Sequence, residues 1–102
     1  MSAADSPGGN VVQISGPATL YESAEVHETL VSGLAEGGDV VFDLETSGPW
    51  DLSGLQLLLA AVASGRKLSK SVRFARVPKV CAEVAERSGL GAWLRDQTDS
   101  FL

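Results

Sequence analysis

Ser53 is the residue of this sequence whose surroundings most clearly suggest chemistry. It lies two residues after Asp51 and directly before Gly54, where a leucine-rich segment begins. An aspartate at that place caps a helix, because its carboxylate accepts hydrogen bonds from the free N–H groups of the first turn. A hydroxyl in the same turn lies where those groups and the helix dipole favour an added anion. The sequence therefore indicates Ser53 as a place for a phosphate, although most serines at helix starts are only caps or spectators.

Residues that could catalyse a reaction are scarce. The sequence has no Gly-x-Ser-x-Gly turn, no Walker phosphate loop and no Gly-x-Gly-x-x-Gly segment after a strand, and His27 is its single histidine. Asp43 and Asp51 could work as a pair of carboxylates, but a strand-end acid and a helix cap explain them more simply. Cys81 is the single cysteine, and its apolar neighbours predict a buried thiol. We therefore expect a protein that is not an enzyme and that uses no metal ion and no cofactor.

The composition is that of one globular domain. Of the 102 residues, 44% are hydrophobic and 21% are charged, which argues against a disordered chain. The longest apolar run, residues 52–64, is too short to span a bilayer, and residues 1–10 lack the features of a signal peptide. We therefore expect a cytoplasmic protein without membrane insertion, with a flexible tail at residues 1–10 and one folded domain at residues 11–102.

Acidic and basic residues are distributed unevenly along the chain. Residues 1–51 contain nine acids and neither lysine nor arginine, whereas residues 52–102 contain eight bases and four acids. The net charge of −5 argues against nucleic acid as a direct partner. One group of bases could bind something anionic, but its members are more simply explained as the solvated ends of a helix and a strand. The group consists of Arg66, Lys67, Lys70, Arg73, Arg76 and Lys79.

The pattern of apolar residues predicts strands that alternate with helices. This β-α-β-α-β-α order implies a small, mainly parallel β-sheet with helices packed on it, an α/β fold. The second strand is almost continuously apolar and suits a central position, whereas the third alternates apolar and polar residues and suits a place nearer an edge. The predicted strands are residues 11–15, 39–44 and 72–77, and the predicted helices are residues 21–34, about 51–68, and Pro78 to a stop at Ser88-Gly89-Leu90.

Ser47-Gly48-Pro49 is expected to form the turn between the second strand and the second helix, because these residue types favour turns. Functional sites of such folds gather at the carboxyl ends of strands, where residues 47–53 lie. A last turn from Gly91 onward is expected to pack Trp93 and Leu94 onto the body. The side chains expected on the core faces of the three helices are Val26, Leu30, Val31 and Leu34, then Leu55, Leu58, Leu59 and Val62, then Val80, Cys81 and Val84.

Several short segments occur in an order that is found in a known family. They are Asp43-Leu44, Asp51-Leu52-Ser53-Gly54-Leu55, Leu57-Leu58-Leu59, Val77-Pro78-Lys79-Val80 and Glu86-Arg87-Ser88-Gly89-Leu90. This order, over about residues 11–94, resembles the sulfate transporter and anti-sigma factor antagonist (STAS) domains. In that family, an Asp-Leu strand end leads to an Asp-Ser-Ser/Thr/Ala-Gly-Leu turn, a leucine-rich helix, a strand and a helix that closes on Ser/Thr-Gly-Leu. The family's usual first strand is expected to be missing here or shrunk into the glycine-rich tail.

The resemblance implies a non-catalytic regulatory module that binds another protein. Ser53 matches the serine or threonine that an anti-sigma kinase phosphorylates, Asp51 the acid before it, and Gly54 the small residue beside it. Such a domain docks on a serine-kinase anti-sigma factor when unphosphorylated, and phosphorylation switches the docking off. The residues implied to contact the partner are Trp50, Asp51, Leu52, Ser53 and Gly54.

Two alternatives remain open. Short domains of this outline also resemble constitutive interaction subunits of chemotaxis-type signalling systems or of lipid-transporting ABC complexes, which need no phosphorylation, and there Trp50 would anchor the contact. An acyl carrier also places a modified serine after an aspartate at a helix start. Its order is Asp-Ser-Leu rather than Asp-Leu-Ser, however, and its fold is all helical, so the predicted strands argue against it.

Overall fold

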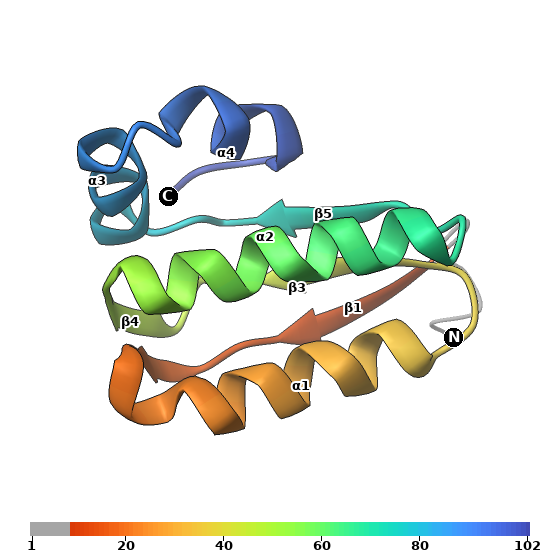
Figure 1. The fold of residues 1–102 in the computed structure, drawn as a ribbon. Coiled ribbons are helices and arrows are strands. Elements are labelled where there is room, and N and C mark those ends of the chain that lie inside the picture. The colour runs from red at the N-terminus through yellow and green to blue at the C-terminus, as the bar shows by residue number, and fades with distance from the viewer. Residues whose placement is uncertain (1–8) are drawn as a thin grey trace.

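A three-stranded parallel sheet lies at the centre of the fold, with β3 in the middle (Figure 1). The computed structural model describes residues 9–102. Val12 lies beside Phe42, and Phe42 lies beside Phe74, so one face of the sheet carries a continuous apolar row. The predicted parallel α/β sheet and the central place of its second long strand are confirmed. The strands are β1 (Gly9–Gln13), β3 (Asp39–Asp43) and β5 (Val72–Ala75).

The first strand starts two residues earlier than predicted, because β1 already begins at Gly9 and pairs with Asp39. Most of the predicted flexible tail, together with any further strand before β1, lies outside the described residues. At its other end, β1 stops at Gln13 rather than at residue 15, and the chain enters a second strand three residues later.

A second, two-stranded sheet joins β2 (Gly16–Ala18) to β4 (Ser47–Trp50) in parallel, and this corrects the predicted turn at Ser47-Gly48-Pro49. Gly16 pairs with Ser47, and Ala18 pairs with Trp50. The Gly48–Pro49 peptide bond is cis. Residue types that favour turns form a strand here because their backbone groups meet a partner strand far away in the sequence.

Two long helices, α1 (Ser23–Ala35) and α2 (Leu52–Lys67), pack side by side over one face of the main sheet (Figure 1). Right-handed crossovers between neighbouring parallel strands place successive helices on the same face. A short 3-10 helix, η2 (Leu20–Glu22), precedes α1. Two side chains differ from prediction, since Val31 is exposed and Leu59 is only partly buried. The buried core includes Leu30, Phe42, Leu55, Leu58 and Phe74.

Helix α3 (Lys79–Arg87) follows Pro78, which is its N-cap residue. Its predicted stop is confirmed, because Gly89 has a φ of +76° and the N–H of Leu90 donates to the carbonyl of Ala85 at 2.7 Å. Cys81 and Val84 are buried as predicted, with Ala85 beside them. Val80 is exposed instead, because it lies toward Gly48 of β4 rather than toward the core.

The C-terminal segment covers the outer edge of β5. Helix α4 (Gly91–Gln97) buries Leu94 and brings the Trp93 ring to 6.3 Å from the Phe74 ring, as predicted. Beyond it, the N–H of Asp99 donates to the carbonyl of Phe74 at 2.7 Å. Strand β5 ends at Ala75, two residues before the predicted end, because Arg76 has a φ of +51° and leaves the strand conformation. Among the described residues, no helix is long and apolar enough to cross a membrane.

Candidate functional site

Ser53 lies in the first turn of α2, directly after the Asp51 cap and the first helical residue. One carboxylate oxygen of Asp51 accepts the N–H of Gly54 at 3.2 Å, so the predicted helix cap is confirmed. Ser53 is partly buried, and Leu52 is 43% exposed. The Ser53 hydroxyl therefore lies at the positive end of a 16-residue helix, where a negative charge is stabilised.

The second carboxylate oxygen of Asp51 accepts the N–H of Leu20 at 2.9 Å. This contact joins η2 to the start of α2, although the two residues are 31 positions apart. Sequence reasoning missed this turn as part of the site. The sequence did contain a signal for this turn, because Thr19 and Glu22 have the spacing of a capping box. The structure shows that capping box. Between them, Leu20 is 62% exposed and Tyr21 is 92% exposed.

Trp50 and Gly54 support the site from beneath, which corrects their predicted role as surface contacts. Trp50 is 5% exposed, and its indole N–H donates to the Ser47 hydroxyl at 2.8 Å. Gly54 is buried against β2, where an added Cβ would lie 2.2 Å from the carbonyl oxygen of Ala18. The burial follows from the pairing of β4 with β2, which turns Trp50 inward and lays α2 over it. As a result, Asp51, Leu52 and Ser53 form the accessible part of the predicted five-residue contact.

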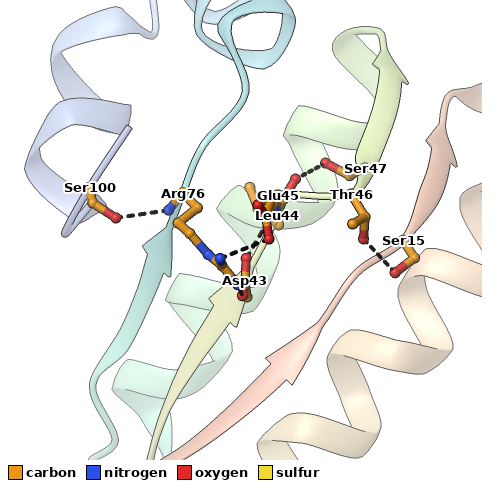
Figure 2. A network of polar contacts seen from close by, with 8 residues as sticks. All are labelled: Ser15, Asp43, Leu44, Glu45, Thr46, Ser47, Arg76 and Ser100. Atoms are coloured by element: carbon orange, nitrogen blue, oxygen red, sulfur yellow. Dashed lines mark hydrogen bonds and ion pairs between the residues drawn. The ribbon is translucent and has the colours of Figure 1, made fainter. Parts of the chain in front are cut away.

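A polar network at the carboxyl ends of β3 and β5 holds the loop that leads to β4 (Figure 2). Figure 2 shows Arg76 reaching from the end of β5 to the Asp43 carboxylate. The same guanidinium also contacts Glu45 at 2.8 Å, and the Asp43 carboxylate accepts the N–H of Glu45 at 3.0 Å. The bond from Arg76 lowers the pKa of Asp43, and it outweighs burial, which acts in the opposite direction.

The loop continues the network toward Trp50. The Ser47 hydroxyl donates to the carbonyl of Leu44 at 2.6 Å, while its oxygen accepts the indole N–H described above. The hydroxyls of Thr46 and Ser15 are 2.7 Å apart, which links this loop to the chain after β1. Side-chain contacts therefore run from the end of β3 to the residue before the Asp51 cap, and they position the start of α2.

The structure does not join Asp43 and Asp51 into a pair of carboxylates. Asp43 binds Arg76 and the backbone of Glu45, whereas Asp51 binds the backbone N–H groups of Leu20 and Gly54. Within residues 9–102, no three histidine, cysteine, aspartate or glutamate side chains gather into a group that could hold a metal ion. Burial raises the pKa of Cys81 to about 12, so this thiol is a poor nucleophile.

A family model described as "Mlab, STAS domain" matches residues 1–96 of the chain. The chain belongs to the STAS domain family. No curated protein matches the sequence. Among solved structures, one similar chain is a sulfate transporter family protein from Wolinella succinogenes, with a TM-score of 0.70 and 16% sequence identity. The match covers 93% of this chain and 77% of that chain, and at this identity it supports the fold alone.

STAS domains generally act as non-catalytic binding modules, and membership of the family supports a regulatory or interaction role for this chain. The accessible surface of this STAS domain around Ser53 comes from two parts of the chain. One part is the start of α2, with Asp51, Leu52 and Ser53. The other is the turn at Leu20 and Tyr21, which the Asp51 carboxylate holds beside the first.

Proposed function

We propose that this STAS domain is a regulatory protein-binding module that is switched off by phosphorylation of Ser53. In its active form, it docks on a serine-kinase anti-sigma factor, as an anti-sigma factor antagonist does. The observation that carries the proposal is the position of Ser53 in the first turn of α2, beside the Asp51 carboxylate and the exposed Leu52. A hydroxyl there combines a helix N-terminus that suits a phosphate with an apolar neighbour that suits a partner.

A phosphate on Ser53 would weaken docking for two physical reasons. It adds about −1.5 to −2 charges and three strongly hydrated oxygens to a surface that already carries Asp51. A partner that covers Leu52 would have to remove water from those oxygens, and burying a charged group without a matched partner is costly. The unmodified hydroxyl imposes neither cost, so the unphosphorylated domain is the form that binds.

A second candidate is a constitutive interaction subunit of a chemotaxis-type signalling system or of a lipid-transporting ABC complex. The exposure of Leu52 favours it, because an apolar side chain gives a contact that needs no modification. In that case Ser53 would be one contact residue among several. The two candidates differ in whether Ser53 carries a phosphate in the cell and whether charge at this position changes binding.

The first test is intact-mass and fragment mass spectrometry of the protein isolated from its own cells. A phosphate on Ser53 supports the switch, whereas an unmodified Ser53 under every growth condition supports the constitutive subunit. The second test measures the affinity for the serine-kinase anti-sigma factor by calorimetry. Ser53→Asp should weaken binding by about tenfold or more and Ser53→Ala should not. Ser64→Asp, on an exposed serine near the other end of α2, is the matched control. Equal affinities of the two Ser53 variants would contradict the switch.

A further inference from the structure

The turn formed by Leu20 and Tyr21 presents two apolar side chains to solvent in a conformation that is already ordered. The Thr19 N–H donates to the Glu22 carboxylate at 3.0 Å, and the Glu22 N–H donates to the Thr19 carbonyl at 3.0 Å. The N–H of Leu20 donates to Asp51. Three hydrogen bonds thus restrain a turn whose side chains have little contact with the protein's own core.

We infer that Leu20 and Tyr21 are the anchor of the docking surface, and that the partner protein offers them an apolar pocket bordered by lysine or arginine where it faces Glu22 and Glu25. The part of the partner that covers Ser53 carries no such cation, so a phosphate on Ser53 has no matched charge there. The inference rests on the proposed function, since it names the partner's surface for the same site. Tyrosine is enriched among the residues that dominate binding energy, because its ring covers a large area with few rotatable bonds. An ordered turn loses little conformational entropy when a partner covers it, so more of the contact energy appears as affinity.

The turn and Ser53 belong to one surface because Asp51 contacts both of their elements. Its carboxylate accepts the N–H of Leu20 from the turn and the N–H of Gly54 from the first turn of α2. Leu52, which directly follows this aspartate, is exposed in the same region. A partner that covers Leu52 and Ser53 therefore reaches the turn as well, and Asp51 acts as a positioning residue between the two.

The expected sign of the partner's charge follows from the acids around the turn. Residues 9–51 contain eight acids and no lysine or arginine. Glu22 lies within the turn, Glu25 lies exposed in the first turn of α1, and Asp51 lies beneath Leu20. An apolar pair surrounded by carboxylates is complementary to an apolar pocket surrounded by cations, and such complementarity speeds association and excludes acidic partners.

Photo-crosslinking in the native cells tests whether the turn touches the partner. Three variants are made, each with one photoreactive phenylalanine, at position 21, 52 or 68. Positions 21 and 52 should form an adduct with the same protein, which mass spectrometry identifies. Position 68 is the matched control, because Leu68 is also exposed but follows the C-terminus of α2. The absence of an adduct at position 21, or the same adduct at position 68, overturns the inference.

The partner that the cross-links identify is then purified without a cross-link, and calorimetry measures its affinity for variants of this protein. Tyr21→Ala should weaken binding by about tenfold or more, and Leu68→Ala should leave it within about twofold. Higher salt should also weaken binding of the unmodified protein, because salt screens the attraction between its acids and the partner's bases. An affinity that does not change with salt would overturn the inference that lysine or arginine borders the pocket. If Leu52→Ala and Ser53→Asp weaken binding but Tyr21→Ala does not, this inference fails and the proposed function stands. If none of the three weakens binding, the proposed function itself fails.

Discussion

Gly54 of α2 lies so close to the main chain of Ala18 in β2 that a side chain has no room between them. An added Cβ would lie 2.2 Å from the Ala18 carbonyl oxygen and 2.9 Å from the Trp50 ring. The oxygen belongs to backbone that is paired with β4, so it cannot move aside cheaply. The close approach fixes the height of the first turn of α2, and with it Ser53, above the small sheet.

We therefore predict that Gly54→Ala lowers the free energy of unfolding by about 1–3 kcal/mol, because α2 must shift to relieve the overlap. Urea unfolding followed by circular dichroism measures the loss. Gly37→Ala is the matched control, because no atom lies within 4 Å of a Cβ at that position. An equal effect of the two substitutions would show that the close packing at Ala18 is unimportant.

Trp50 is predicted to act through stability rather than through contact with a partner. Trp50→Ala should lower the free energy of unfolding by about 3–5 kcal/mol, because it empties a buried site. Trp50→Phe keeps most of the buried ring but loses the donor to Ser47, so it should cost less. In calorimetry, folded Trp50→Phe should bind the partner as tightly as the unmodified protein. A large loss of affinity without a loss of stability would return Trp50 to the contact surface.

Asp51 is predicted to stabilise the start of α2 and to restrain the turn at Leu20 and Tyr21. Asp51→Ala should cost about 1 kcal/mol of stability, because the first turn of α2 loses its cap, whereas Asp51→Asn should cost only a few tenths. Hydrogen exchange measured by NMR gives the second readout. The amide of Leu20 should exchange faster in Asp51→Ala, while the amide of Glu22, which is bonded to Thr19, should not. Unchanged exchange at Leu20 would mean that Asp51 does not restrain the turn.

Asp43 is predicted to make stability depend on acid pH. The pKa of its carboxyl group is lowered in the folded state, and the hydrogen bond from Arg76 is the largest cause. The folded state therefore binds a proton at Asp43 less readily than the unfolded state does. The carboxylate therefore stabilises the fold at neutral pH, and this contribution is lost as the pH falls below the usual range for aspartate. Asp43→Asn should be less stable than the unmodified protein near pH 7, and the difference should shrink as the pH falls through the usual range for aspartate and then through the lowered pKa of Asp43.

Urea unfolding at several pH values measures the convergence for Asp43. Asp96→Asn is the control, because the side chain of Asp96 is exposed on α4. It should have little effect at any pH. Parallel stability curves for Asp43→Asn and the unmodified protein would show that the pairing with Arg76 does not stabilise the fold.

Local sequence was sufficient where each residue's role depends on its neighbours along the chain. The Asp51 cap, the helix stop at Gly89 and the central apolar strand at residues 39–43 are of this kind. Hydrogen bonds within one turn of helix and the periodicity of apolar residues determine such features. The order of these segments also pointed to the STAS domain, which the family model matches.

The tertiary structure decided the features that depend on pairing between distant segments. Ser47 to Trp50 became a strand because β2 offers it a partner, and that pairing moved Trp50 from the expected surface into the core. The Leu20 turn joined the site only because its N–H meets the Asp51 carboxylate, 31 residues away. The sequence by itself thus determined the helix start at Asp51 and the place of Ser53 in its first turn, since a cap is a local interaction. Which side chains surround Ser53 was decided by the folded chain, because burial and long-range hydrogen bonds depend on segments that the sequence keeps far apart.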